Sequence, residues 1–327
     1  MRSRTPAGRR VAAAGAAVAT LLAVAACGSS SPSSSATAGA SAPGTRGSST
    51  AAPAGGTSSP SSVAARGTGP VDVLYAGSLT TLMNGTLGPA FNHATGYTFD
   101  GFPGGSSSLA SQIRGRVLQG DVFLSAAPSV NSTLRGPGNG SWVSWYAPFA
   151  TTSLVLGYNP GSRFAAALRH EPWYRVIARP GFRLGFTDPR LDPKGVLTVQ
   201  ALDRAATAYR EPSLRRIASD QSDLFPEQDL VGRLQSGQLD AGFFYTVEAS
   251  AARIPTVSLG PIDLRATYTV TVLANAPHRA AGESFVRFLL GPRGAALLRS
   301  VGLSTIASPR AVGAGVPAAL HGVIRSP

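Results

Sequence analysis

The sequence contains very few sulfur-bearing and lysine side chains. Of its 327 residues, a single one is cysteine, Cys27, and a single one is lysine, Lys194, so arginine carries almost all of the positive charge. A lone cysteine excludes an intrachain disulfide and a cluster of cysteine ligands around a metal ion. After residue 26, no apolar run reaches the roughly 18 residues that a membrane-spanning helix needs. These absences indicate a globular fold that depends on packing rather than on cross-links or bilayer insertion.

The motifs of common enzymes are missing as well. None of the four histidines has a second histidine or a carboxylate three or four residues further on, which is the spacing of a helical metal pair. The chain has no Gly-x-Ser-x-Gly elbow and no phosphate-binding loop of the Gly-x-x-x-x-Gly-Lys type. We therefore expect a binding protein rather than an enzyme, with no catalytic residue, no cofactor and no resident metal.

The net charge of +13 raises the question of nucleic-acid binding. Four of the arginines lie before residue 11, and the others are scattered along the chain. After residue 10 there is no basic run with interleaved aromatic residues, which is the pattern that follows a phosphate backbone. The charge therefore predicts no nucleic-acid partner.

The N-terminus has the pattern of an exported lipoprotein. Arg9 and Arg10 precede an apolar run over residues 11–26, which has the length of a signal-peptide core. The run Leu-Ala-Val-Ala-Ala-Cys-Gly over 22–28 resembles a bacterial lipobox, in which the cysteine is lipidated and becomes the first mature residue. We expect residues 1–26 to be a signal peptide and Cys27 to anchor the protein on the extracytoplasmic face of the cell membrane. The alternative is an ordinary secretory leader with a chance cysteine.

A low-complexity segment follows the predicted signal peptide. Serine, alanine, glycine, threonine and proline make up nearly all of residues 28–69. Such a composition has too little apolar surface to offset the entropy of ordering the chain. We interpret residues 27–69 as the lipidated cysteine followed by a disordered tether.

From residue 70 onward, strand-like apolar runs alternate with helix-like segments, which predicts an α/β fold. A buried strand over 71–76 ends at Gly77-Ser78, and a helix is expected over 79–93. A second strand over 97–102 ends in a Pro-Gly-Gly turn, and the serines 106–108 open another helix. A strand, a small-residue turn and a helix N-terminus can bind an anion, because the first helical amides have no partner within the helix. N-capping explains one such serine by itself, whereas two corners together favour a ligand site.

The remaining chain continues the alternation. Asp192 before Pro193 has the chemistry of a helix N-cap, which is a structural role for that aspartate. Residues 211–226 are polar and irregular, and residues 309–327 form a weakly patterned tail. We expect strands over 120–126, 142–146, 151–158, 183–187, 241–245, 256–259 and 266–274, and helices over 106–118, 163–177, 196–208, 226–234 and 279–300.

Five segments, in order, resemble the molybdate/tungstate-binding receptors of ABC transporters. The resemblance covers about residues 71–305, and the pattern from 226 to 245 is similar to the tungstate-type subgroup. It implies a two-lobed periplasmic-binding-protein-like fold (type II) with the ligand cleft between the lobes. Lobe I would comprise 70–150 and 268–308, and lobe II 151–267. The five segments are Tyr75–Leu79, Phe102–Ile113, Gly120–Ala126, Phe186–Gly195 and Pro226–Gly232.

The same resemblance implies the ligand-binding residues. Ser78 and Ser106 would donate hydroxyl and amide hydrogen bonds to the oxyanion oxygens. Asp192 and Glu227 would complete an expanded coordination around the molybdenum or tungsten centre. Tyr245 would lie near the ligand.

Two of these positions have a rival nearby. Ser107 is an alternative to Ser106, because the three serines at 106–108 leave the register open by one residue. Asp188 is an alternative to Asp192, because both precede a proline. The family pattern favours Asp192, since a glycine follows its Asp-Pro pair two residues later.

Two carboxylates beside a dianion require a physical reason, because like charges repel strongly in a closed cleft of low dielectric constant. They fit if they bind the electropositive centre of the oxyanion, or if they are protonated. Sulfate has no accessible centre of this kind, so carboxylates would disfavour it. We therefore expect a receptor that captures molybdate or tungstate and delivers it to an ABC transporter permease. The alternatives are a receptor for sulfate, thiosulfate, a phosphonate or a ferric complex, and then a lipid-anchored enzyme or surface interaction protein.

Overall fold

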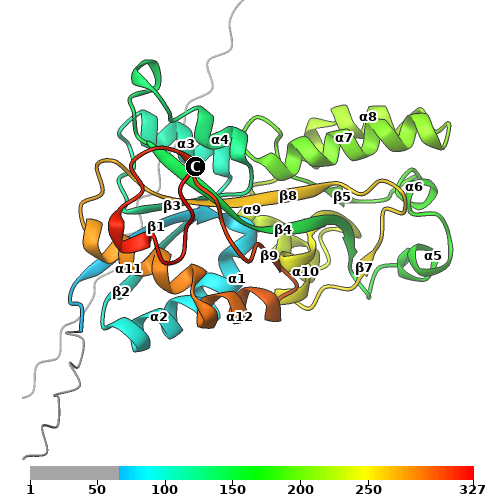
Figure 1. Ribbon diagram of the computed structural model, residues 1–327. Helices are drawn as coiled ribbons and strands as arrows, with labels where there is room; N and C mark the ends of the chain where they lie inside the picture. The colour runs from blue at the N-terminus through cyan, green and yellow to red at the C-terminus, as the bar shows by residue number, and fades with distance from the viewer. Residues whose placement is uncertain (1–65) are drawn as a thin grey trace, which may run out of the picture. The chain divides into compact units, whose positions relative to one another are not determined.

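The computed structural model describes residues 66–327, which lie within one compact unit (Figure 1). The predicted signal peptide, Cys27 and nearly all of the predicted tether lie outside these residues. Helices cover both faces of a mixed sheet, which confirms the α/β class expected from the sequence. Within 66–327, no helix combines the length and the apolar character needed to cross a membrane.

One part of the sheet, which we call lobe I, is built around a buried apolar strand. This strand, β1 (Pro70–Ala76), lies between β2 (Thr98–Gly104) and β3 (Val122–Ser125) and runs parallel to both. Next to β3, β8 (Arg265–Val272) is antiparallel, and β4 (Trp145–Tyr158) is antiparallel to β8. A strand covered on both faces needs apolar side chains on both, and the sequence of β1 meets that need because five of its seven residues are buried.

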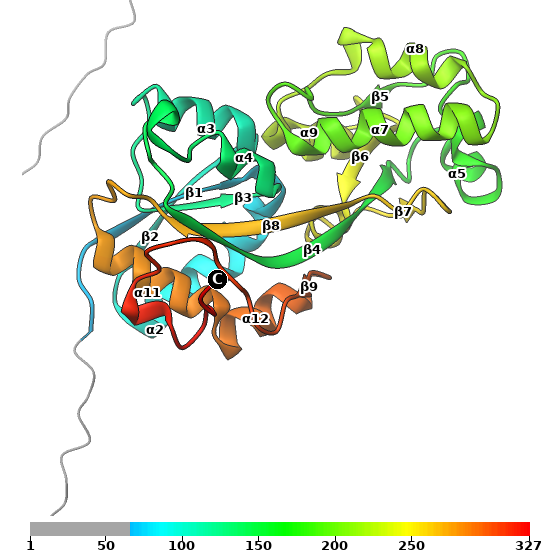
Figure 2. The same cartoon turned by 45° about the horizontal axis from the view of Figure 1, so that its top comes forward.

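The strands β4 and β8 connect lobe I to a second part, lobe II (Figure 2). The last residues of β4, Leu154–Tyr158, pair with β6 (Ala241–Tyr245) instead of β8. Beyond β6 lies β5 (Leu184–Gly185), and β7 (Thr256–Val257) also pairs with the end of β4. The chain therefore has the two-lobed arrangement that the sequence resemblance implies.

The sequence pattern predicted two strands, over 142–146 and 151–158, where the structure has the single strand β4 of 14 residues. The pairing between β4 and β8 is irregular between Pro148 and Ala150. Proline has no N–H to donate to a neighbouring strand, so a strand tolerates it where the ladder is interrupted. Residues 145–146 and 151–158 of the two predicted strands therefore belong to one strand, and its irregular pairing lies between them.

The segment after β1 is helical, as predicted, but its hydrogen-bond pattern changes along its length. The irregular stretch lies before Pro89, whose missing N–H interrupts an α-helical ladder. In chain order the parts are a 3-10 turn η1 (Gly77–Leu79), α1 (Thr80–Leu82), a π-helical stretch η2 (Met83–Leu87) and α2 (Gly88–Thr95).

Proline also divides two of the predicted helices. The segment 163–177 forms α5 (Ala165–His170) and α6 (Trp173–Val176), separated at Pro172, and 279–300 forms α11 (Arg279–Leu290) and α12 (Pro292–Ser300). Residues 211–226 are less irregular than predicted, because they contain α8 (Ser213–Ser219). The other helices and turns are α3 (Ser106–Arg114), α4 (Pro128–Ser132), α7 (Pro193–Ala208), α9 (Glu227–Gln235), α10 (Thr246–Ala251), η3 (Pro137–Asn139), η4 (Gln221–Asp223) and η5 (Ala318–Leu320).

The C-terminal residues pack onto the rest of the fold despite their weak sequence pattern. The short strands β9 (Ser304–Thr305) and β10 (Val312–Gly313) both pair with β4. Leu320 and Ile324 are buried in the main hydrophobic core. With so few buried side chains over 309–327, no period of two or 3.6 residues could reveal this packing.

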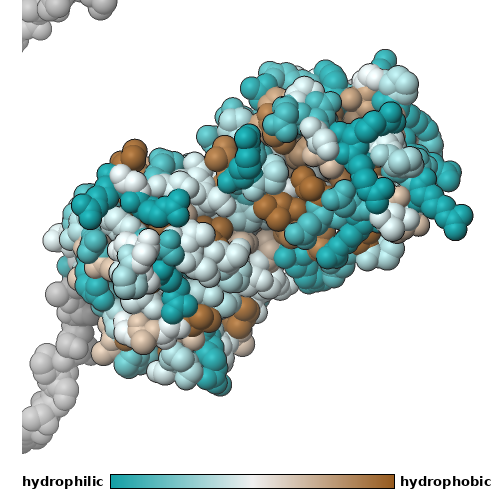
Figure 3. All heavy atoms as spheres, turned by 90° about the horizontal axis from the view of Figure 1, so that it is seen from above, coloured by the Kyte–Doolittle hydropathy of each residue, from teal (hydrophilic) through white to brown (hydrophobic). Residues whose placement is uncertain are grey.

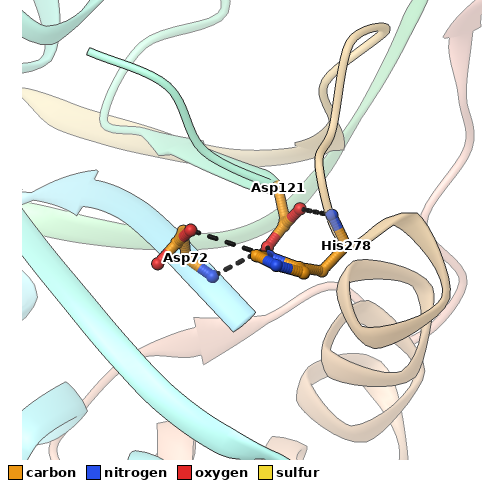
Figure 4. A group of neighbouring side chains, drawn as sticks. All are labelled: Asp72, Asp121 and His278. Carbon is orange, nitrogen blue, oxygen red and sulfur yellow. Dashed lines mark hydrogen bonds and ion pairs between the residues drawn. The ribbon is translucent and has the colours of Figure 1, made fainter. Parts of the chain in front are cut away.

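A buried aspartate, Asp121, ties the start of β1 to the start of α11 (Figure 4). Its Oδ2 accepts a hydrogen bond from the Asp72 amide at 2.8 Å and contacts His278 Nδ1 at 3.2 Å. Its Oδ1 accepts the amide hydrogen of His278, the N-cap residue of α11. The side-chain ligand atoms of these three residues lie within 4.8 Å of one another, as a metal site would require. Both Asp121 oxygens already accept hydrogen bonds, so a structural role accounts for the group.

We predict that Asp121→Ala lowers the free energy of unfolding by about 2–4 kcal/mol, because the amides of Asp72 and His278 lose their acceptor. Asp100→Ala removes an exposed carboxylate from the neighbouring strand β2 and should change the same quantity by less than about 0.5 kcal/mol. Chemical denaturation followed by circular dichroism measures both variants. Equal effects would contradict the anchoring role of Asp121.

Candidate functional site

The parallel strands β1 and β2 bring two serine corners together. Ala76 and Gly104 are register partners in this pair of strands. Ser78 lies two residues after Ala76, within η1, and Ser106 lies two residues after Gly104, as the first residue of α3. Since the carboxyl ends of parallel strands meet at one edge of a sheet, both serines lie at the same edge of lobe I.

Both serine side chains are buried, and each hydroxyl has a partner in the protein. Ser78 Oγ lies 2.7 Å from Tyr268 Oη, and either atom can be the donor. Ser106 Oγ accepts a hydrogen bond from the Ala126 amide at 3.1 Å, so its own hydrogen is still available to a ligand. Ser107, the rival of Ser106, is only half-buried.

Lobe II contributes the two predicted carboxyl groups from the starts of two helices. Asp192 is the N-cap of α7, as its sequence context predicted, and its Oδ1 accepts a hydrogen bond from the Lys194 amide at 2.9 Å. Glu227 is the first residue of α9, and its Oε2 accepts a hydrogen bond from the Gly77 amide at 2.8 Å. Both side chains are buried.

The contact between Glu227 and Gly77 crosses from lobe II to lobe I beside Ser78. A Cβ atom on Gly77 would lie 2.8 Å from Glu227 Oε2, so only glycine fits without a shift of the carboxyl group. A second cross-lobe hydrogen bond runs from the Ser108 amide to the Leu191 carbonyl at 3.0 Å. The lobes are therefore in contact at the candidate site.

Three of the five predicted residues have a buried oxygen atom that finds no hydrogen-bond partner among residues 66–327. These atoms are Asp192 Oδ2, Glu227 Oε1 and the Tyr245 hydroxyl. Tyr245 ends β6, and its ring packs edge-on against Tyr268 with centroids 6.2 Å apart. Buried polar atoms are normally satisfied, so a bound solute, or a proton shared between Asp192 and Glu227, would complete the hydrogen bonding of this group.

Sequence reasoning missed two charged residues of this cluster, Lys194 and Glu248. The Lys194 side chain is fully buried, and its Nζ lies 2.8 and 3.1 Å from the two Glu248 carboxylate oxygens. Nζ also lies 3.5 Å from Glu227 Oε1. One signal was available in the sequence, because the single lysine of the chain stands two residues after Asp192.

Burial controls the protonation of these groups. It raises the pKa of Glu227 well above its usual value, and the negative charge of Asp192 raises it further. The pKa of Asp192 is also raised by burial, although Lys194 opposes the shift. Burial lowers the pKa of Lys194, but the charges of Glu248, Glu227 and Asp192 more than compensate, so that pKa is raised overall. The neighbouring carboxylates therefore favour the charged form of the lysine, and burial opposes the ionisation of Glu227.

Both buried tyrosines are hydrogen-bond donors at neutral pH. Burial raises the pKa of Tyr245 and of Tyr268 well above its usual value, and the neighbouring carboxylates add to the shift. A phenol that keeps its hydrogen can donate to an anion, which matches the expected place of Tyr245 near a ligand. Tyr268 was not predicted, because its partner Ser78 is 190 residues away in sequence.

Asp188, the rival of Asp192, lines the same cleft as Asp192 but is paired with Arg190. Its Oδ1 accepts hydrogen bonds from the Arg190 amide at 2.9 Å and from Arg190 Nε at 3.0 Å. These bonds lower the pKa of Asp188, and the Arg190 side chain is largely exposed. Asp188 thus forms a surface ion pair, whereas Asp192 lies in the buried cluster.

A cleft of about 560 Å³ leads to the cluster from the surface. Lobe I lines it with Gly104 and Gly105, and lobe II lines it with Thr187, Asp192 and Glu227. Apolar surface is visible where the two lobes meet (Figure 3). Of the five predicted site residues, Asp192 and Glu227 line this cleft, whereas Ser78, Ser106 and Tyr245 do not.

Known proteins share both the fold and the sequence pattern. The chain is 23% identical over 279 residues to the molybdate/tungstate-binding protein WtpA of Pyrococcus abyssi, covering 69% of this chain and 80% of that protein. It is 30% identical over 194 residues to a Haloferax volcanii protein named as a candidate ABC transporter molybdenum-binding protein, covering 58% and 59% of the two chains. The solved structure of the periplasmic molybdate-binding protein of Azotobacter vinelandii has a similar fold. Its TM-score is 0.56 at 20% identity, over 71% of this chain and 98% of that chain.

The family assignment comes from a match over most of the described residues. The model of the bacterial extracellular solute-binding proteins matches residues 71–304, which is more than half of the chain. This range includes both lobes, the cleft and every member of the buried cluster. The chain therefore belongs to the family of bacterial extracellular solute-binding proteins.

Proposed function

We propose that this solute-binding protein captures molybdate or tungstate and delivers it to the permease of an ABC transporter. The observation that carries the proposal is the pair of buried, unpartnered carboxyl oxygens, Asp192 Oδ2 and Glu227 Oε1, opposite the serine corners of lobe I. The names of the relatives in Pyrococcus abyssi and Haloferax volcanii support the same ligand and the same transport context.

The serine side of the site would bind the oxygens of the oxyanion. Ser106 has a hydroxyl hydrogen to donate, and it begins α3, whose first amides, apart from the Ser108 amide bonded to Leu191, would be available to the ligand. Ser78 and the Tyr245 phenol supply further O–H groups. These neutral donors suit an anion, and they leave the choice between anions to the other side of the site.

The carboxyl side would bind the central atom. Molybdenum and tungsten are large, electropositive centres that accept further oxygen ligands, whereas the sulfur of sulfate does not. Asp192 and Glu227 would therefore favour the metal oxyanions and repel sulfate. Asp188 makes no comparable ligand, because Arg190 already occupies its carboxylate.

The N-terminal segment completes the proposal. Residues 1–26 would direct export, lipidated Cys27 would anchor the protein in the membrane, and residues 27–69 would tether the folded part. Lobe I would comprise 70–150 and 268–308, and lobe II 151–267, with 309–327 as a C-terminal tail. The role is that of a receptor rather than an enzyme.

The first test is a thermal-shift assay with tungstate, molybdate and sulfate. A ligand at 100 times its dissociation constant adds about 2.7 kcal/mol of stability to the wild-type protein. We expect this shift with tungstate and molybdate and none with sulfate. A shift with sulfate alone would support the alternative receptor, and the absence of any shift would favour a different class of protein.

Glu227→Gln should weaken the binding of both metal oxyanions by at least about tenfold, which corresponds to 1.4 kcal/mol. The amide keeps the size of the side chain but is a poor ligand for the metal centre. Asp229→Asn makes the same change at an exposed position two residues further along α9, and its affinity should equal that of the wild type. Isothermal titration calorimetry measures both, and unchanged affinity in Glu227→Gln would contradict coordination by this residue.

A change at Gly77 should impair binding through geometry alone. Gly77→Ala places a Cβ 2.8 Å from Glu227 Oε2 and forces the carboxyl group away from the amide that it now contacts. We expect the affinity for tungstate to fall by at least about tenfold, the factor for 1.4 kcal/mol. Gly85→Ala is the matched control, because no atom lies within 4 Å of a Cβ placed there. If both variants bind like the wild type, the cross-lobe contact has no part in binding.

The raised pKa of Glu227 predicts that binding releases a proton. Between the ordinary and the raised pKa of Glu227, this carboxyl group is protonated in the ligand-free protein. It must lose that proton before it can coordinate the metal centre as a carboxylate. Affinity should therefore rise with pH through this window and level off above the raised pKa. By the same linkage, the stability of the ligand-free fold should fall as pH rises through the window. Calorimetry in buffers with different ionisation enthalpies counts the proton, and proton uptake on binding would contradict carboxylate coordination.

A further inference from the structure

We propose that Lys194 is the positioning residue of the oxyanion site and holds both carboxyl ligands in place. This inference rests on the proposed function, since it concerns how Asp192 and Glu227 are presented to the metal centre. It gives a role to the single lysine of the chain, a residue that the family resemblance leaves without one.

Lys194 contacts both carboxyl groups, each through a different part of the residue. Its main-chain amide donates to Asp192 Oδ1 at 2.9 Å, and its ammonium nitrogen lies 3.5 Å from Glu227 Oε1. The first contact leaves Asp192 Oδ2 without a partner. The second supplies a positive charge next to an oxygen that has no hydrogen bond. One residue thus orients two ligands that are 35 positions apart along the chain.

Lys194 is itself held firmly in place. Its ammonium makes a two-pronged contact with Glu248, which lies in the first turn of α10. Glu248 Oε2 also accepts a hydrogen bond from the Tyr245 amide at 3.4 Å. The ammonium lies 5.7 and 5.8 Å from the ring centroids of Phe244 and Tyr245, within the range of cation–π attraction. Because the side chain has no exposed surface, it cannot relax into solvent when a ligand enters.

The charge of Lys194 matters as much as its position. Three carboxyl groups, Asp192, Glu227 and Glu248, face this one ammonium group. Without it, an incoming dianion would meet no positive charge on the carboxyl side of the site, in a medium of low dielectric constant. Residues that orient metal ligands from behind typically change metal affinity by 10–100-fold when they are removed. Lys194 occupies such a place toward Glu227 through its ammonium group, whereas its contact with Asp192 comes from the main-chain amide, which any residue except proline would supply.

The test uses Lys194→Met, which keeps the length of the side chain and removes its charge. We expect tungstate affinity to fall by at least about tenfold. X-ray absorption at the tungsten edge should show fewer oxygen ligands around the bound metal than in the wild type. A residue that serves only the fold would not change the coordination number of the bound ligand. Affinity is measured by calorimetry on protein whose circular dichroism matches the wild type.

The double variant Lys194→Met with Glu248→Gln is a control for misfolding. It removes both charges of the buried pair together, so that neither is left unpaired. It should bind as weakly as Lys194→Met and show the same reduced coordination number. Arg183→Met is the matched control. It takes a cation away from the buried Asp240 at the opposite end of β6, and should leave affinity and coordination unchanged.

Each outcome separates this inference from the proposed function. Wild-type affinity and coordination number in Lys194→Met or in the double variant would overturn the positioning role alone. Full affinity in the double variant with loss only in Lys194→Met would show that an unpaired Glu248, and not a missing cation, causes the loss. Wild-type protein that binds neither tungstate nor molybdate would overturn the proposed function and this inference with it.

Discussion

The hydrogen bond from the Gly77 amide to the Glu227 carboxyl group is the contact on which the candidate site depends. It joins the end of β1 in lobe I to the start of α9 in lobe II, and it is buried. The glycine is required because a Cβ would collide with the carboxyl group. Through Glu227, the contact reaches Lys194 and then Glu248. We therefore expect a substitution of any of these residues to alter the contact between the lobes.

The buried cluster has an unequal balance of charge, and this imbalance explains its chemistry. Its three carboxyl groups have one ammonium partner, and burial makes a second free carboxylate costly. The missing positive charge can be supplied by a proton or by the electropositive centre of a ligand. Under the proposed function, a metal oxyanion would bring such a centre inside a shell of oxygens, and the hydroxyl groups of lobe I would bind that shell. The combination of hydrogen-bond donors on one side and carboxyl groups on the other would distinguish the site from one for a simple anion.

Much of the fold could be predicted from the sequence. The prediction failed where contacts between distant parts of the chain decided the structure and the local sequence pattern did not. The alternation of strands and helices gave the α/β class, and the serine corners lie together because Ala76 and Gly104 pair in β1 and β2. Pro148 hid the continuity of β4, because a bulge that accommodates proline has no sequence signal of its own. Asp192 and Glu227 came from a family resemblance. Glu248 and Tyr268 could not be found, since their partners Lys194 and Ser78 lie 54 and 190 residues away, whereas Lys194 had a signal in its place two residues after Asp192.

The pairing of β4 with β8 has a mechanical consequence for any opening of the cleft. Two antiparallel strands hydrogen-bonded to each other behave as a ribbon, which bends and twists readily but resists sliding, because sliding would break the ladder. The lobes can therefore rotate apart while their register is preserved. Each return to the closed state would then bring the Glu227 carboxyl group back to the Gly77 amide, because the strand register fixes how the lobes align.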